Sequence, residues 1–462
     1  RIKASAPECY ITTMEYQLKS GGPQDAEQNF PKGIQLGLDH ADLLQVRAPK
    51  PTLMITTTRD IFSIQGARDT YEETKRAYKT LGKEGNLLMV EDNAGHQSTL
   101  NNREAMYAFF QKHLDNPGNS KDEEVVIFPV EELYVTETGQ LSTSVGSKFL
   151  FHLNSDRTKK NLVLLNEGRQ NLNQHLINLK QKVKAISGYT ETAKKAKLIF
   201  SGQTEFEAYF LNKYLIKEEG DKIIPFITFV PKHPMGGLVL YLDNMKDKES
   251  SDAYAIPIQM AQKGVTVIVP DLPGYGELGP GYLKGDAYFE NTSYNQWFAG
   301  ILNGKSTVAI HVEAIETLLQ VCKTDLKLDD KEIMGISKGG FNSSLLHAAV
   351  LGVDFKGMLF LDPLLSFQSV VSDKNYNPAH IPFTVAGALP NYDLQDLSAA
   401  FAPKKLKIIT ESDTLAAEQF KKSCEFVAKR YESMDEANNF SITKINAARE
   451  AMNLINAFIS DF

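Results

Sequence analysis

The stretch MGISKGGFNSS, from Met334 to Ser344, stands between an apolar run and a helical pattern. Within it, Gly335, Ser337 and Gly339 fit the pattern G-x-S-x-G. Glycines at these positions are typical of a sharp strand-to-helix turn that lifts the serine oxygen out of a sheet. The pattern therefore predicts such a turn here, with Ser337 as a candidate nucleophile.

Two backbone donors are expected beside this serine. The N–H of Lys338, at the start of the predicted helix, would face the oxygen anion that forms when the serine attacks a carbonyl group. Asn244, just after the apolar run GLVLYLD, is the candidate for the second donor. Together they would stabilise the negative charge that develops during acyl transfer.

The segments around the turn alternate between strand and helix patterns. Strand-like runs are GLVLYLD, GVTVIVPD, KGMLFLD and LKIIT, and helical patterns are AIHVEAIETLLQVC and AAREAMNLINAFISDF. Strands that are apolar along most of their length are typical of a mostly parallel sheet with helices on both faces. Residues 236–462 are therefore predicted to form a doubly wound α/β core.

A shorter α/β pattern occupies residues 1–114. A strand-like PTLMITTT, a helical FSIQGARDTYEETKRAYKTLG, a strand-like NLLMV and a helical NREAMYAFFQKHL follow one another, as in parallel β/α units. Residues 115–131 are predicted to be a linker. Residues 132–235 contain an apolar helical stripe and a hairpin pattern, so they are predicted to hold connecting helices and the first strands of the second domain.

Composition narrows the classes of function. The length of 462 residues suits two or three domains, and the net charge of -7 disfavours nucleic acid or an anionic membrane as a partner. No apolar run approaches the length of about 18 residues that a membrane span needs. The three cysteines lie far apart, which disfavours a disulfide framework and a zinc cluster.

Two motifs with binding potential are interpreted as structural. Gly274, Gly276 and Gly279 form a GxGxxG, but no helical pattern opens directly after them, so a dinucleotide site is disfavoured. The tract at 39–42, Asp-His-Ala-Asp, has no second ligand cluster beside it in the sequence. We therefore predict no cofactor and no metal site.

Three features together resemble the α/β-hydrolase superfamily. They are the strand end Asp-x-Pro-Gly-x-Gly at 271–276, the helix opening GKSTVAIHVEAIETLL and the turn at Ser337. More narrowly, VEELYVTETGQLSTSVG and GPQDAEQNFP are similar to phrases in tandem acetylxylan-esterase-like hydrolases of polysaccharide-degrading bacteria. The resemblance implies two α/β-hydrolase domains in tandem and a serine esterase. Its substrate would be acetylated plant polysaccharide, such as acetylated xylan, or a small ester, and its location periplasmic or secreted.

A serine nucleophile needs a base, and in this superfamily the chain order is nucleophile, acid, histidine. Asp413, in IITESD, is the candidate acid, but no histidine follows it, because the last histidine in the chain is His380. The first zone has both partners, since Asp60 ends LMITTTRD and His96 follows the strand NLLMV. Asp60 and His96 are therefore a second candidate pair of acid and base.

Both α/β zones close with the letters Arg-Glu-Ala-Met, at 103–106 and at 449–452. The interval from Asp60 to Arg103 is 43 positions and that from Asp413 to Arg449 is 36, so the second zone is seven residues shorter. The shortening falls where GHQST stands in the first zone. We interpret the two zones as diverged copies of one domain, the second of which has lost its histidine loop.

The start of the chain is interpreted through the same alignment. Setting ASAP at 4–7 against FLDP at 360–363 places Pro7 opposite Pro363 and puts the first copy's serine near position -19. The chain is therefore expected to begin inside the first domain, with the N-terminal half of that domain missing. Catalysis would belong to the first domain of a longer parent, the second would be a degenerate pseudo-enzyme copy, and these 462 residues alone would be inactive.

Two alternatives stay open. The protein could be a non-enzymatic binding or scaffold module in which both sites are dead. The second domain could instead be active, with Ser337 served by a non-standard histidine. For that role His380 is favoured over His311 and His347, because those two lie within helical patterns.

Overall fold

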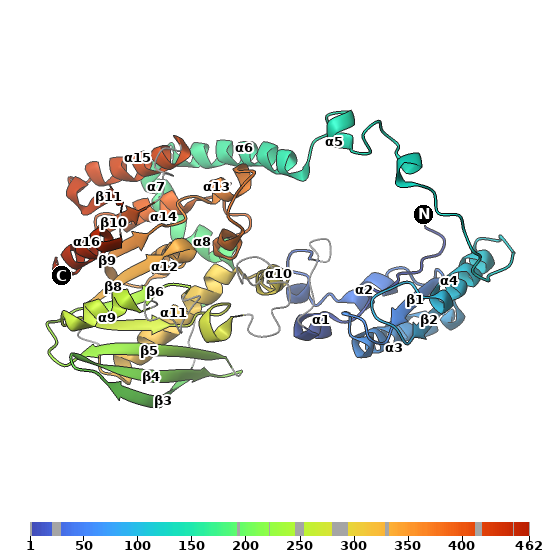
Figure 1. Cartoon of the computed structure of the whole chain (residues 1–462), viewed down its shortest axis with the longest axis horizontal. Helices are drawn as coiled ribbons and strands as arrows, with labels where there is room; N and C mark the ends of the chain where they lie inside the picture. The colour runs from blue at the N-terminus through green and yellow to red at the C-terminus, as the bar shows by residue number, and fades with distance from the viewer. Residues whose placement is uncertain are drawn as a thin grey trace. The chain divides into compact units, whose positions relative to one another are not determined.

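The computed structural model describes residues 2–20, 29–191, 195–220, 222–244, 254–279, 294–328, 332–411, 418–446 and 448–461. These residues fall into two compact units (Figure 1). Unit 1 contains Arg1–Ser147 and Tyr294–Gly304, and unit 2 contains the rest of the described chain from Lys148 onward. The boundary after Ser147 falls inside the predicted segment 132–235.

Unit 2 is built on a nine-stranded sheet. Its strands are β3 (Ala196–Glu205), β4 (Tyr209–Glu218), β5 (Ile223–Pro231), β6 (Leu238–Leu242), β7 (Thr266–Pro270), β8 (Ile333–Lys338), β9 (Phe355–Leu361), β10 (Lys405–Thr410) and β11 (Phe440–Lys444). They lie in the order β11-β10-β9-β8-β6-β7-β5-β4-β3. The strands from β11 to β7 are parallel, and β5, β4 and β3 add antiparallel pairs, of which β4–β5 is the predicted hairpin. Unit 2 is therefore an α/β structure with a mostly parallel sheet.

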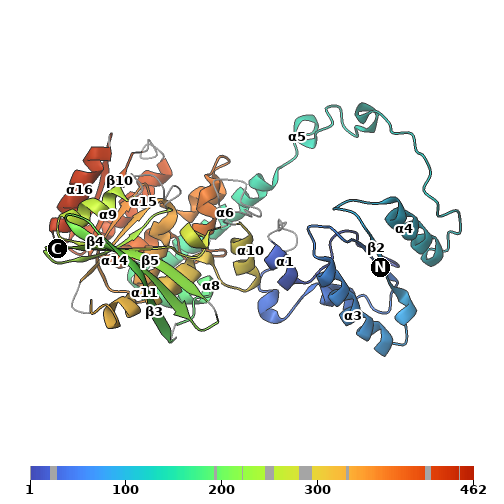
Figure 2. The same cartoon turned by 60° about the horizontal axis from the view of Figure 1, so that its bottom comes forward.

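Helices cover both faces of this sheet, as Figure 2 shows. They are α6 (Leu150–Arg169), α7 (Leu172–Ile177), α8 (Leu179–Ser187), α9 (Ala255–Gln262), α11 (Thr307–Thr324), α12 (Asn342–Leu351), α13 (Phe367–Ser372), α14 (Leu394–Phe401), α15 (Glu418–Glu432) and α16 (Ala448–Ser460). One buried cluster joins α9 and α16 to the sheet, and a larger one joins α8, α11, α12 and α14 to it. Helices on both faces of the sheet are predicted from the sequence, because the strands are apolar along most of their length.

Unit 1 contains a small parallel sheet. Its elements are α1 (Met14–Ser20), α2 (His40–Gln45), β1 (Thr52–Thr57), α3 (Ile64–Thr80), β2 (Leu87–Asp92), α4 (Leu100–His113) and α5 (Leu141–Ser144). β1 pairs with β2, and Ser5 and Glu8 form parallel bridges to the other edge of β1. In both units, none of the described helices is long and apolar enough to cross a lipid bilayer.

A helix from much later in the chain completes unit 1. α10 (Tyr294–Leu302) clusters with the N-terminal residues. The N–H of Lys32 donates to the carbonyl oxygen of Ile301 at 2.9 Å. A side chain placed at Gly304 would meet the amide oxygen of Gln35 at 2.3 Å. Unit 1 is thus discontinuous in sequence.

The two units use the same buried tyrosine bond beside a parallel strand. In unit 1 the Tyr78 hydroxyl donates to the Lys50 carbonyl at 2.7 Å, just before β1. In unit 2 the Tyr431 hydroxyl donates to the Lys404 carbonyl at 2.7 Å, just before β10. Both tyrosine side chains are fully buried. Each bond fastens the helix that carries the tyrosine, α3 or α15, to the start of its neighbouring strand.

The two units also begin an equivalent helix in the same way. At α2, Asp39 accepts from a helix N–H and the side chain of Asp42 accepts the Asp39 N–H in return. At α14, Asp393 and Asp396 form the same reciprocal cap. Such caps satisfy backbone donors that a helix start otherwise leaves unpaired. The tract at 39–42 is therefore a helix cap in this structure.

Removing either tyrosine hydroxyl should destabilise its unit by about 1 kcal/mol, because the buried ring loses its hydrogen bond to a backbone carbonyl. We expect Tyr78→Phe and Tyr431→Phe to lower the free energy of unfolding by similar amounts, measured by urea denaturation with circular dichroism. Tyr376→Phe is the control, because Tyr376 is 39% exposed. A negligible effect of both buried variants would show that these bonds do not stabilise the units.

Candidate active site

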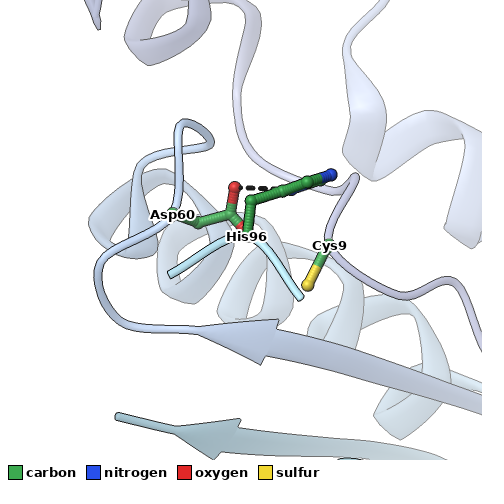
Figure 3. Close-up of side chains that lie close together, drawn as sticks. All are labelled: Cys9, Asp60 and His96. Atoms are coloured by element: carbon green, nitrogen blue, oxygen red, sulfur yellow. Dashed lines mark hydrogen bonds and ion pairs between the residues drawn. The ribbon is translucent and has the colours of Figure 1, made fainter. Parts of the chain in front are cut away.

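The carboxyl ends of β1 and β2 bring Asp60 and His96 together. The two strands are parallel neighbours, and their last residues, Thr57 and Asp92, pair directly. Loops that follow parallel neighbours leave the sheet at the same edge. His96 Nδ1 consequently lies 2.9 Å from Asp60 Oδ1 (Figure 3). The structure thus brings together the two residues that the sequence predicts as acid and base.

Asp60 is held as a buried, ionised acceptor. Its side chain is only 2% exposed. The Thr57 hydroxyl donates to Oδ2 at 2.8 Å, and the Phe62 N–H donates to Oδ1 at 3.2 Å. Burial by itself raises the pKa of Asp60, but the hydrogen bonds from Phe62, Thr57 and His96 outweigh it and leave the pKa below its ordinary value.

The two ring nitrogens of His96 lie in different surroundings. Because Asp60 is ionised, it accepts a hydrogen bond from Nδ1–H, which assigns the proton of the neutral ring to Nδ1. Figure 3 shows the other ring nitrogen pointing away from Asp60. The His96 side chain is 52% exposed, and its ring centroid lies 5.9 Å from that of Phe62. Nε2 is therefore an acceptor that a reacting group can reach.

Cys9 is a third member of this cluster, and the sequence analysis does not single it out. Its Sγ lies 3.7 Å from Thr57 Oγ1 and 3.6 Å from the Gln97 carbonyl oxygen, to which it donates. Burial is the largest cause that raises the pKa of the thiol to about 11, so Cys9 is a neutral thiol at physiological pH. One ligand atom from each of Cys9, Asp60 and His96 lies within 4.8 Å of the others, a donor set that zinc accepts.

Asp362 occupies the corresponding strand end of unit 2. Cys9 has a φ of 51° and Asp362 a φ of 44°, both in the left-handed region that non-glycine residues seldom adopt. Asp362 Oδ1 accepts the hydroxyl of Thr410 at 2.9 Å, as Cys9 contacts the hydroxyl of Thr57. This likeness between the two strand ends is visible only in the structure, so the sequence carries no signal for Cys9.

The shared backbone conformation gives a different pairing of the two zones from the predicted one. Pro7 precedes Cys9 by two positions, whereas Pro363 follows Asp362 directly. Setting Cys9 opposite Asp362 places Pro7 opposite Phe360, three positions from the predicted partner Pro363.

The prediction that a sharp turn lifts the Ser337 oxygen out of the sheet is wrong. β8 continues through Lys338, and the backbone reaches positive φ only at Gly339, at 60°. Ser337 is paired on both sides, with Leu242 and Phe360, and is fully buried. Its Oγ has no hydrogen-bond partner among the described residues.

The two predicted oxyanion donors differ in their surroundings. Lys338 has extended backbone (φ -115°, ψ 144°) and is the N-cap of the 3-10 helix Gly339–Phe341, which leads into α12, so it lies at the start of a helix as predicted. The N–H of Asn244 donates to the carboxylate of its neighbour Asp243 at 2.7 Å, so it is already engaged. Asp413 lies outside the described residues. Among the described residues, no acid or histidine forms a hydrogen bond with the Ser337 hydroxyl.

The two helical histidines of unit 2 use both ring nitrogens in buried contacts. His311 Nδ1 lies 2.9 Å from Ser344 Oγ and its Nε2 lies 3.0 Å from the Pro273 carbonyl oxygen. His347 Nδ1 lies 2.6 Å from the Ser343 carbonyl oxygen and its Nε2 lies 3.2 Å from the Tyr392 hydroxyl, and both rings are buried. Burial lowers the pKa of each histidine to about 4.

His380 does not serve Ser337 either. It lies in the 3-10 helix Pro378–Phe383, and burial lowers its pKa. The unpartnered Ser337 Oγ receives no contact from it or from another histidine of the described chain. The alternative of an active second domain therefore has no support in this geometry.

Comparisons with solved structures return esterases. One is a candidate acetyl xylan esterase from Bacteroides fragilis, with 15% identity, a TM-score of 0.49, and coverage of 59% of this chain and 75% of that one. A methylesterase gives 14% identity and a TM-score of 0.44 over 95% of this chain and 87% of that one. The acetyl xylan esterase from Paenibacillus sp. R4 gives 15% identity and a TM-score of 0.39 over 62% and 93%. No family model and no curated protein matches the chain.

Replacing Ser337 by alanine should be neutral or stabilising, because it removes a buried hydroxyl without a partner. Burying an unpaired hydroxyl costs about 1–3 kcal/mol, so we expect Ser337→Ala to raise the free energy of unfolding by up to about 1 kcal/mol. Ser344→Ala is the matched control, because its hydroxyl is paired with His311 and its loss should destabilise. A clear decrease in the free energy of unfolding of Ser337→Ala would show that the Ser337 hydroxyl does have a hydrogen-bond partner.

Unit 2 should lose stability as the pH falls below about 6.5. His311 and His347 have folded pKa values of about 4, so the unfolded chain takes up protons that the native state excludes. The stability that the two neutral histidines contribute is fully present above about pH 6.5. It falls by roughly 2 kcal/mol per histidine between about pH 6.5 and pH 5. Urea denaturation across this range tests it. His347→Gln should remove the part of the slope that comes from His347, and an unchanged slope would refute the assignment.

Proposed function

We propose that the protein is a carboxylic ester hydrolase whose catalytic acid and base are Asp60 and His96 in unit 1. The observation that carries this proposal is the 2.9 Å bond between a buried carboxylate and an exposed imidazole. This arrangement orients the ring and leaves one nitrogen free to take a proton. In unit 2, His175 Nε2 lies 3.1 Å from Asp396 Oδ1, but both side chains are buried and Asp396 is also bound by Arg169, so we assign this pair no catalytic role.

His96 would act twice in the reaction. Its Nε2 first takes the proton of a serine hydroxyl as that oxygen attacks the ester carbonyl, and then gives the proton to the departing alcohol. In the second step Nε2 takes a proton from the water that attacks the acyl-enzyme, and returns that proton to the serine oxygen as the acid is released. Asp60 stays ionised throughout and stabilises the imidazolium, as its lowered pKa allows.

The serine of this triad would precede the strand segment at residues 5–8. In unit 2 the matching strand, β9, lies between β10 and β8, and β8 comes before it in the chain. Segment 5–8 pairs with β1 on one side, as β9 pairs with β10. A counterpart of β8 would therefore lie before residue 1 and deliver its serine to the edge where His96 Nε2 is exposed. Cys9 does not fill this role, because its thiol is neutral.

We also propose that the two units are diverged copies of one α/β-hydrolase domain. The repeated tyrosine bonds and helix caps support this, and so does a further pair of bonds. Asn86 Nδ2 donates to the Pro49 carbonyl at 2.7 Å, and Asn439 Nδ2 donates to the Pro403 carbonyl at 2.9 Å. The copies would differ where the histidine loop of the first has no equivalent in the second.

The substrate class follows from the sequence resemblance. Acetylated plant polysaccharide, such as acetylated xylan, is the proposed natural ester, and the periplasm or the cell exterior is the proposed compartment. A small aryl acetate would serve as a surrogate, because the acyl group, not the alcohol, forms the covalent intermediate.

Hydrolysis of 4-nitrophenyl acetate and acetylated xylan by the product of the complete open reading frame tests the proposal. We expect His96→Ala to lower kcat/KM by about 10²–10⁴-fold and Asp60→Asn to lower it comparably, because the base is lost or misoriented. Ser337→Ala is the matched control and should leave kcat/KM unchanged.

Two results would overturn this assignment. Loss of activity in Ser337→Ala would move catalysis to unit 2. Absence of ester hydrolysis from the complete product, with both substrates, would favour the alternative of a binding module.

A further inference from the structure

Unit 2 contains a cavity at the carboxyl ends of its parallel strands. Its volume is about 560 Å³, and it lies between the ends of β8, β9 and β10 and the helices α9 and α16. Small-ligand pockets commonly have volumes of about 300–1,000 Å³, and α/β sheets bind ligands at this edge. The cavity therefore has the size and position of a ligand site, in the unit to which we assign no catalysis.

The cavity lies where unit 1 carries its histidine loop. In unit 1 the chain from the end of β2 at Asp92 to the start of α4 at Leu100 contains His96. In unit 2 the chain passes from the end of β11 at Lys444 to the start of α16 at Ala448. The shorter connection contributes Ile445 to the cavity wall.

Two cations in the cavity wall lack partners. Lys338 and Arg449 both line it, and neither forms an ion pair or hydrogen bond with a side chain of the described residues. Arg103, at the corresponding start of α4, is bound by Asp122, with Nε–Oδ2 at 3.0 Å and Nη2–Oδ2 at 2.5 Å. Arg103, in the first turn of α4, is thus neutralised by an ion pair, whereas Arg449, in the first turn of α16, forms no such pair among the described residues.

The wall also offers acceptors and apolar surface. Asp362 and Glu411 line the cavity, and Asn456 lines it with a buried Oδ1 that has no partner in the described chain. Ile409 and Ile455 are among the apolar residues of the wall. A matching ligand therefore needs a negative group for the two cations, hydroxyl donors for the acceptors, and C–H surface for the isoleucines.

We infer that this cavity binds a sugar that carries a carboxylate, such as a uronic acid. Arginine forms two parallel hydrogen bonds to a carboxylate, so Arg449 would hold the acid group, with Lys338 as a second charge. Sugar hydroxyls would donate to Asp362, Glu411 and Asn456 Oδ1. The unit would bind without reacting, because the Ser337 hydroxyl is buried. This inference is independent of the proposed esterase function.

Calorimetric titration of the whole chain with D-glucuronate, D-glucose and acetate tests it. We expect glucuronate to bind at least about tenfold more tightly than either D-glucose or acetate, because only glucuronate offers both charge and hydroxyls. Arg449→Gln should weaken glucuronate binding by about tenfold or more, whereas Arg103→Gln, at the matched position of unit 1, should not change it. Circular dichroism checks that both variants are folded.

Each of the following results would refute one part of this inference. Equal binding of glucuronate and glucose, or wild-type binding by both Arg449→Gln and Lys338→Gln, would refute recognition of the carboxylate. Equal binding of acetate and glucuronate would reduce the cavity to a simple anion site. No heat and no competition with any of the three ligands would refute the site. His96→Ala should bind glucuronate normally, which separates this test from that of the esterase.

Discussion

Parallel pairing of β1 with β2 is the constraint on which the candidate active site depends. Neighbouring parallel strands end at one edge, so an acid after the first and a histidine after the second meet although 36 positions separate them in the chain. The hydroxyl of Thr57, on β1 itself, then helps to hold Asp60 ionised. The electrostatics of the site thus follow from the register of two strands.

Residues whose role follows from strand order were predictable from the sequence. Asp60 and His96 each follow a recognisable apolar strand, so their meeting could be predicted without coordinates. Ser337 shows the opposite case. G-x-S-x-G describes five residues, but whether the chain turns at the serine depends on pairing with β6 and β9, which no local pattern reports. Cys9 carried no signal, because a lone cysteine has no spacing to interpret.

The two units keep their buried frame and differ in the loops at the strand ends. Tyr78 and Tyr431 make the same bond, yet Arg103 in the first turn of α4 and Arg449 in the first turn of α16 have different surroundings. The tyrosine bonds satisfy backbone carbonyl groups and are costly to lose. A loop at a strand end, in contrast, can shorten with little effect on the core. In the proposed pair of copies, divergence in such loops would change the chemistry while the architecture persists.

The discontinuity of unit 1 bears on how this protein can be divided. α10 belongs with the N-terminal residues through contacts such as Lys32 to Ile301, but the chain that follows it from Lys305 onward belongs to unit 2. Cleavage of the exposed chain between α4 and α6 would therefore leave two polypeptides that still share one folded unit. A gene fragment that stops at residue 147 would lack a helix of the unit that it was meant to encode.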